Sequence, residues 1–268
     1  MVKRVLTSLI GAPVLAVVLF FGGMPLAVAV LLLSAIGLFE FYRAAKVSYE
    51  KINFVGYFFA ILYVGLAYFD MAENFTFPIA VLFILVLFCI VVILYDKVSV
   101  TDCAKVFLGF MYIAGLFSCV IFVRNSENGI YNVWIIFLAA FGSDTGAYIT
   151  GKLFGKRKLA PNLSPKKTVE GSIGGIILAG AASAVLGVIF YKLGFIDSTD
   201  VMFFAIVGTI GGAFSQIGDL AASAIKRRSG IKDFGDILPG HGGVLDRFDS
   251  VLFVAPLVYI SLKVLSQF

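Results

Sequence analysis

The chain has 268 residues, of which 60% are hydrophobic and 14% are charged, and its formal net charge is +5. Its mean hydropathy is +1.02. A soluble domain typically has about 25% charged residues, so this composition excludes an ordinary soluble enzyme and indicates a membrane protein with many spans. The three cysteines have no metal-ligand spacing. We therefore expect neither a disulfide framework nor thiol chemistry.

Nine apolar segments are long enough to cross a bilayer, which requires roughly 20 residues of helix. The sequence therefore predicts an all-α fold, a polytopic integral membrane helix bundle with about nine transmembrane helices. The predicted spans are 5–21, 25–42, 54–70, 78–95, 106–123, 131–150, 170–191, 201–225 and 245–265.

The first two predicted spans are separated only by Gly22-Gly23-Met24, so we expect a tight hairpin or a partly re-entrant pair. The order of charged and apolar residues at the N-terminus resembles a signal peptide, with a cleavage-like triplet at Ala27-Val28-Ala29. However, the apolar sequence continues past that triplet to Phe41. We therefore interpret the first segment as a retained helix.

The basic residues predict the orientation of the bundle. With the N-terminus in the cytoplasm, all but three of the 21 Lys and Arg residues fall on the cytoplasmic side, the exceptions being Arg124, Lys192 and Lys263. This strong bias follows the positive-inside rule. It also accounts for most of the basic residues without a nucleic-acid partner, and we expect none.

The two halves of the chain differ in their content of ionisable residues. Residues 1–130, with about five helices, are nearly uniformly apolar, and we interpret them as a transmembrane scaffold. Residues 131–268, with about four helices, are expected to form the catalytic region. This region includes two cytoplasmic loops, 151–169 and 226–244, that are rich in charged residues.

Four aspartates lie within or at the ends of predicted spans, namely Asp144, Asp219, Asp246 and Asp249. A carboxylate in the hydrocarbon region costs at least a few kcal/mol, about 2.5 or more, so four of them need a shared explanation. A bound divalent cation provides one, because it keeps carboxylates ionised and offsets their mutual repulsion. The alternatives are helix packing for Asp144 and a simple ion pair for Asp249.

Basic residues and glycines adjoin these aspartates. Lys166 and Lys167 precede a helix start, where anions are favoured by free N–H groups. The glycines around His241, the only histidine, can bring backbone N–H groups close to a phosphate. For each cation the alternative is the ordinary positive-inside effect. The expected phosphate-binding residues on the cytoplasmic side are Lys166, Lys167, Lys226, Arg227, Lys232, His241, Gly242, Gly243 and Arg247.

The segment from Ser223 to Asp249, SAIKRRSGIKDFGDILPGHGGVLDRFD, resembles the long, fixed-spacing signature of phosphatidate cytidylyltransferases, also called CDP-diacylglycerol synthases. The segments Ser143-Asp144-Thr145 and Leu163 to Gly171 are also similar to this family. The resemblance implies condensation of CTP with phosphatidic acid to give CDP-diacylglycerol and pyrophosphate, with Mg²⁺. It also implies a multi-pass protein of a bacterial inner membrane with its active site facing the cytoplasm.

The resemblance and the site chemistry together suggest roles for the residues. Asp219 and Asp246 would hold Mg²⁺, with Asp144 and Asp249 as additional ligands. Whether one or two ions bind remains open. Lys167, Lys226 and Arg247 would neutralise the triphosphate, and His241 with its glycines would contact substrate. The expected catalytic residues are Asp219, Asp246, Lys167 and Lys226. The expected substrate-binding residues are Ser223, Lys166, Arg227, Lys232, His241, Gly242, Gly243 and Arg247.

Two other functions and a homodimer are weighed against this interpretation. Intramembrane aspartates in glycine-interrupted helices are also typical of ion-coupled transporters, although the charges here gather towards one side and no inverted repeat is visible. A CDP-alcohol phosphotransferase would carry an aspartate motif that is absent here. The GxxxG pairs Gly171–Gly175 and Gly208–Gly212 permit a homodimer.

Overall fold

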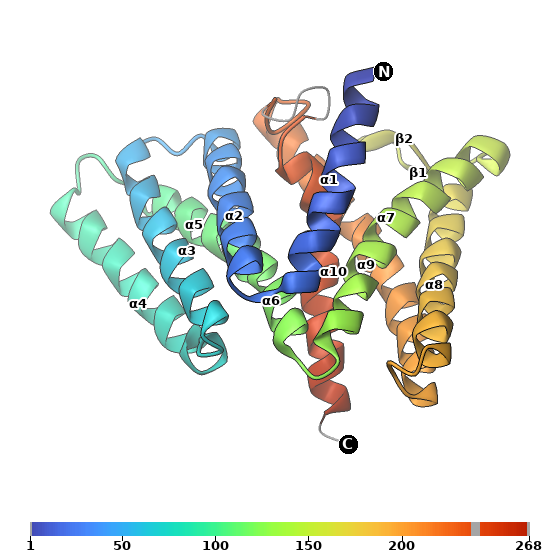
Figure 1. The fold of residues 1–268 in the computed structure, drawn as a ribbon. Helices are drawn as coiled ribbons and strands as arrows, with labels where there is room; N and C mark the ends of the chain where they lie inside the picture. The colour runs from blue at the N-terminus through green and yellow to red at the C-terminus, as the bar shows by residue number, and fades with distance from the viewer. Residues whose placement is uncertain (1, 237–241, 267–268) are drawn as a thin grey trace. The chain divides into compact units, whose positions relative to one another are not determined.

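The computed structural model describes residues 2–236 and 242–266, and in this part of the chain nearly all regular structure is helical (Figure 1). The elements are α1 (Val2–Phe21), α2 (Gly23–Ala45), η1 (Glu50–Ile52), α3 (Asn53–Tyr68), α4 (Ala72–Ile93), α5 (Val100–Gly109), η2 (Phe110–Gly115), α6 (Leu116–Asn125), α7 (Gly129–Phe154), β1 (Lys158–Ala160), β2 (Ser164–Thr168), α8 (Val169–Lys192), α9 (Ser198–Ser229) and α10 (Leu245–Leu265).

The predicted all-helical, polytopic class is confirmed. Among the described residues, eight helical segments are long and apolar enough to cross a membrane, and they follow in order the second to ninth predicted spans. The fifth predicted span is one continuous helical segment, Val100–Asn125, in which α5 and α6 are joined by the π-helical turn η2. The first predicted span coincides with α1, a helix of 20 residues.

A tight turn joins the first two helices, as the glycines predict. Only Gly22 lies between α1 and α2, with φ of 62° and ψ of −147°. Gly23 follows at φ of 49°. Residues other than glycine rarely adopt a positive φ, so the two glycines make the abrupt reversal of the chain possible.

The two predicted cytoplasmic loops are shorter than expected. Helix α7 continues to Phe154, and residues beyond it form the antiparallel hairpin β1–β2, in which Lys158 pairs with Thr168. Helix α9 continues to Ser229, so Lys226 and Arg227 belong to its last turns. Basic residues stabilise a helix C-terminus, and Gly230, at φ of 74°, then permits the chain to leave the helix.

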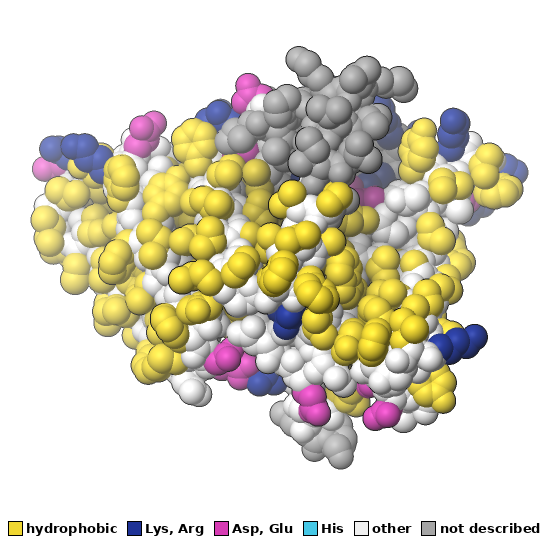
Figure 2. All heavy atoms as spheres, viewed as in Figure 1, with side chains coloured by type: hydrophobic (Ala, Val, Ile, Leu, Met, Phe, Trp, Pro, Cys, Tyr) yellow, Lys and Arg dark blue, Asp and Glu magenta, His cyan; other side chains and the backbone are white. Residues whose placement is uncertain are grey.

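Large apolar side chains are exposed on the outer helices. Phe58 on α3 and Phe77 and Phe88 on α4 are 62%, 78% and 55% exposed. Figure 2 shows hydrophobic side chains covering the flank formed by α3 and α4, with charged side chains gathered at the helix ends. This distribution is typical of helices that face lipid, because only the apolar middle of each helix meets the hydrocarbon region.

The helices form two compact units. Unit 1 comprises Met1–Phe122 and Arg228–Arg247, and unit 2 comprises Val123–Arg227 and Phe248–Phe268. The segment Arg228–Arg247 therefore packs with the N-terminal helices, although it lies late in the sequence. The predicted division into a scaffold, 1–130, and a catalytic region, 131–268, concerns function and stays a prediction.

An aromatic cluster forms the core of unit 1. The rings of Phe59 and Phe83 are stacked with centroids 4.2 Å apart, and Phe110 meets Phe83 edge-on at 5.0 Å. The buried Tyr42 of α2 donates its hydroxyl hydrogen to the carbonyl of Val106 at 3.0 Å. The tyrosine hydroxyl thus finds its partner inside an otherwise apolar core, which fixes α2 against α5.

Small residues form the packing surfaces of unit 2. A Cβ at Gly175 would lie 2.6 Å from the carbonyl oxygen of Ser143, and one at Gly212 would lie 2.7 Å from the Cβ of Ala179. Both glycines, like Gly171 and Gly208, are buried within the unit. The two GxxxG pairs are therefore used in packing α7, α8 and α9 together and do not provide a dimer surface, so the homodimer stays a prediction without that support.

Candidate active site

Unit 2 contains a pocket of about 380 Å³ between α7, α8, α9 and the β1–β2 hairpin. This volume lies within the range of small-molecule sites. Three lysines and two aspartates on its wall give it both signs of charge. The lining residues are Asp144, Ala147, Tyr148, Gly151, Lys152, Leu159, Lys166, Lys167, Thr168, Gly171, Ser172, Gln216 and Asp219.

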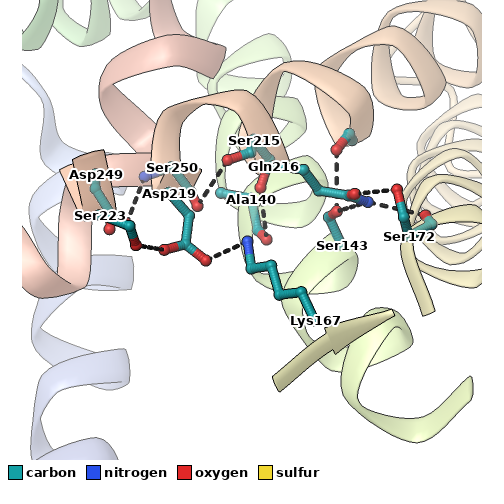
Figure 3. Close-up of polar contacts among 11 residues, drawn as sticks. Ala140, Ser143, Lys167, Ser172, Ser215, Gln216, Asp219, Ser223, Asp249 and Ser250 are labelled. Carbon is teal, nitrogen blue, oxygen red and sulfur yellow. Dashed lines mark hydrogen bonds and ion pairs between the residues drawn. The ribbon is translucent and has the colours of Figure 1, made fainter. Parts of the chain in front are cut away.

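An ion pair between Lys167 and Asp219 is the central polar contact of this pocket (Figure 3). Lys167 comes from β2, and Asp219 comes from the middle of α9. Both side chains keep part of their surface exposed, 22% for Lys167 and 29% for Asp219. Ser223, one turn further along α9, donates to Oδ1 of Asp219 at 3.5 Å. The pair is thus within reach of a ligand in the pocket.

The hairpin places Lys167 next to a capped helix start, as predicted. Thr168 is the N-cap of α8, and its hydroxyl oxygen accepts the N–H of Gly171 at 3.1 Å. Lys166, the residue before Lys167 in β2, is more exposed than Lys167 and lines the same pocket. Two ammonium groups therefore lie on the pocket wall beside the N-terminus of α8, an arrangement that favours anions.

Asp249 is the most buried of the predicted aspartates, at 7% exposure. Its Oδ1 accepts the N–H of Ser250 at 2.7 Å. Asp249 lies within electrostatic range of Asp219, Asp144 and Lys226. Unit 2 therefore brings together three of the four predicted aspartates and the predicted cations Lys166, Lys167 and Lys226.

This donor set fits a hard divalent cation that is shared with a substrate. Within the described residues, no three His, Cys, Asp or Glu side chains converge closely enough to hold an ion on their own. Mg²⁺ in phosphate-transferring sites is usually held by one or two carboxylates together with substrate phosphates and water. Asp219, exposed in the pocket with Asp144 and Asp249 nearby, provides ligands of this kind.

Of the predicted residues in unit 1, Gly242, Gly243 and Asp246 lie together at the start of α10. Oδ2 of Asp246 accepts the N–H groups of Phe234 at 2.7 Å and Gly243 at 3.0 Å. Gly242 adopts a φ of 84°, as expected for a turn glycine. The N–H of Gly243, which the sequence assigned to a ligand, is therefore bound by Asp246. Lys232 and Arg247 are exposed, and Arg227 of unit 2 is exposed at the end of α9. His241 lies outside the described residues.

Comparison with known proteins covers nearly the whole chain. The model of the cytidylyltransferase family matches residues 2–265. The chain belongs to this family. Among similar proteins, the phosphatidate cytidylyltransferase of Bacillus subtilis (strain 168) is 33% identical over 273 residues, covering 99% of each chain. That of Staphylococcus haemolyticus (strain JCSC1435) is 34% identical over 269 residues, covering 97% of this chain and 98% of the relative.

Sequence reasoning missed the amide that organises the floor of the pocket. Gln216 of α9 donates through Nε2 to Ser143 Oγ at 3.2 Å and to the carbonyl of Ser172 at 2.9 Å. Its Oε1 accepts the hydroxyl of Ser172, and Ser143 donates to the carbonyl of Gly212 at 3.0 Å (Figure 3). Gln216 therefore joins α7, α8 and α9 one turn before Asp219. The signal in the sequence is an amide among small residues three positions before a carboxylate.

Replacing Gln216 by Leu is expected to destabilise the protein by about 2–3 kcal/mol, because the hydroxyl and carbonyl of the half-buried Ser172 lose this partner and the buried Ser143 keeps only its bond to Gly212. Thermal unfolding of the detergent-solubilised protein measures the effect. The matched control is Thr209→Val on the same helix, since the exposed Thr209 donates its hydroxyl to Ala205 within α9 and valine has the same shape. Equal melting temperatures for the two variants would contradict a role for the amide network in joining the helices.

Proposed function

We propose that this protein transfers a cytidylyl group from CTP to phosphatidic acid, giving CDP-diacylglycerol and pyrophosphate for phospholipid synthesis. The observation that supports this most directly is the match of the whole chain to the cytidylyltransferase family, including full-length relatives with that activity in their names. The lysine-rich pocket around the Lys167–Asp219 pair offers the charges that phosphates require. No observation favours the alternative of an ion-coupled transporter.

The reaction requires one bond to form and one to break at phosphorus. A phosphate oxygen of phosphatidic acid bonds to the α-phosphorus of CTP. The bond from that phosphorus to the bridging oxygen breaks, and the electron pair leaves with pyrophosphate. The second pKa of a phosphomonoester is about 6, so the attacking group is already largely ionised at neutral pH. Catalysis then depends on positioning and charge stabilisation, and no strong general base is needed.

The pocket residues would perform that positioning. Lys152, Lys166 and Lys167 would bind phosphate oxygens, with Lys167 held in place by Asp219. Lys226, near Asp249, would add positive charge. Mg²⁺, held by Asp219 with Asp144 and Asp249, would neutralise charge on the triphosphate. The assignment of Asp246 to the same chemistry, and the binding of a second ion, stay predictions from the sequence.

The orientation in the membrane is also part of this proposal. The charge bias supports an orientation in which the ends of α7 and α9 that bear Lys152, Lys226 and Arg227 face the cytoplasm from a bacterial inner membrane. CTP would then reach the pocket from the cytoplasm. Phosphatidic acid would enter from the bilayer between helices, since its acyl chains need not leave the hydrocarbon region.

Product formation by the purified protein tests the proposal. We expect CDP-diacylglycerol, detected by mass spectrometry, and pyrophosphate in equal amounts, and only when CTP, phosphatidic acid and Mg²⁺ are all present. Diacylglycerol in place of phosphatidic acid lacks the attacking phosphate and should give no product. A folded protein that makes neither product with any divalent ion, or that takes up a solute in vesicles without CTP, would overturn the proposal.

A further inference from the structure

Glu40 is a fully buried carboxylate in the apolar helix α2, at 0% exposure. A charge in such a place is costly unless hydrogen bonds satisfy it. Its two oxygens accept the N–H of Val244 and the N–H of Leu245, each at 2.9 Å. Val244 immediately precedes α10 and Leu245 is its first residue, and the N–H groups at a helix start lack intrahelical partners. Glu40 therefore fixes the position at which α10 begins.

Two glycines show that the segment before α10 is shaped around this carboxylate. A Cβ at Gly235 or at Gly243 would lie 2.5 Å from Oε1 of Glu40. Neither position has room for a side chain without displacing the carboxylate. The backbone on both sides of residues 237–241 therefore contacts the same side chain.

Arg43, one turn after Glu40, holds the same segment at a second point. Its Nη2 donates to the carbonyl oxygen of Phe234 at 2.6 Å. The N–H of Phe234 in turn donates to Oδ2 of Asp246, and the ring of Phe234 is buried at 1% exposure. Helix α2 thus holds, through Glu40 and Arg43, the backbone groups that hold the Asp246 carboxylate.

We propose that Glu40 is a positioning residue for the cytidylyl transfer, acting through Asp246. Glu40 fixes the backbone of Val244 and Leu245 through hydrogen bonds and lies against Gly243. The N–H of Gly243 in turn orients the Asp246 carboxylate. This inference rests on the proposed function and on the sequence-based prediction that Asp246 serves the Mg²⁺-dependent reaction. Partners that orient metal-binding residues typically contribute 10- to 100-fold to metal affinity or activity, so the effect is measurable.

The first test is the Mg²⁺ dependence of pyrophosphate release by Glu40→Gln. The amide keeps the shape but presents an NH₂ group to one of the two backbone donors. We expect kcat/KM to fall about 10- to 100-fold and the Mg²⁺ concentration for half-maximal rate to rise by a similar factor. Glu40→Asp, which keeps the charge, should recover part of the loss.

A buried carboxylate elsewhere in unit 1 gives a matched control. Asp102, at 2% exposure, accepts the N–H of Ser48 at 3.1 Å and lies in the first turn of α5. Asp102→Asn should lower the melting temperature as Glu40→Gln does but leave the Mg²⁺ dependence unchanged. If both variants lose stability and neither changes the Mg²⁺ dependence, Glu40 is a structural residue only and the inference is overturned.

Two further measurements separate this inference from the proposed function. Gly235→Ala should displace the Glu40 carboxylate without changing any charge, and it should shift the Mg²⁺ dependence in the same direction. Binding of Mn²⁺, followed by electron paramagnetic resonance with and without α,β-methylene-CTP, requires no turnover. Weaker Mn²⁺ binding by Glu40→Gln and Gly235→Ala, with faster amide exchange at Val244 and Leu245, supports the inference even if no product forms. Unchanged Mn²⁺ binding and exchange overturn it.

Discussion

Asp219→Asn is expected to lower the rate of pyrophosphate release by about 1,000-fold, at the upper end of the effects seen when one charged or hydrogen-bonding catalytic group is removed. The substitution preserves shape but removes the negative charge that pairs with Lys167 and that would bind Mg²⁺. Lys167 loses the contact that holds it at the pocket. The rate is measured at saturating CTP and phosphatidic acid, across a range of Mg²⁺ concentrations.

The control for this variant lies on the same helix. Asp200, in the first turn of α9, accepts the N–H of Asp197 at 3.1 Å and lies outside the pocket lining. Asp200→Asn should retain the wild-type rate to within about a factor of two, since a surface substitution of this kind changes stability by about 0.5 kcal/mol or less. A rate for Asp219→Asn within tenfold of that control would exclude Asp219 from the catalytic site.

Lys167→Gln is expected to lower kcat/KM by about 100-fold, because a charge-assisted contact to the triphosphate is lost in a partly water-excluded pocket. The adjacent Lys166 gives the comparison. It lines the same pocket but is more exposed, so solvent screens it more strongly, and Lys166→Gln should reduce kcat/KM less than tenfold. Steady-state kinetics with CTP as the varied substrate measures both.

The Lys167–Asp219 pair also predicts non-additive effects. Since the two residues contact each other, the loss in Lys167→Gln/Asp219→Asn should be far smaller than the product of the single losses. Equal effects of Lys167→Gln and Lys166→Gln, or strictly multiplicative losses in the double variant, would show that this ion pair does not act as a unit in the reaction.

Features set by local sequence were predicted well. The order of the spans, the helical class and the turn at Gly22 follow from runs of apolar residues and from glycine, and each depends on neighbours in the chain. The helix start after Lys167 follows from the capping residue Thr168. The errors at the two loops have a local cause as well. The charge of these basic residues favours a loop, but a helix C-terminus also accepts basic side chains, and α9 therefore extends to Ser229.

The amino-acid pattern is enough to predict a polytopic helical protein of the cytidylyltransferase family, with the aspartates and lysines of its candidate site in the second half of the chain. Which polar groups meet depends on tertiary packing. Glu40 lies 204 residues from Val244, and Gln216 lies 73 residues from Ser143, so no periodicity or spacing connects them. The tertiary structure also buries both GxxxG pairs between helices of the same chain. The sequence does not predict this, because small residues allow close approach to any helix, whether it belongs to the same chain or to another.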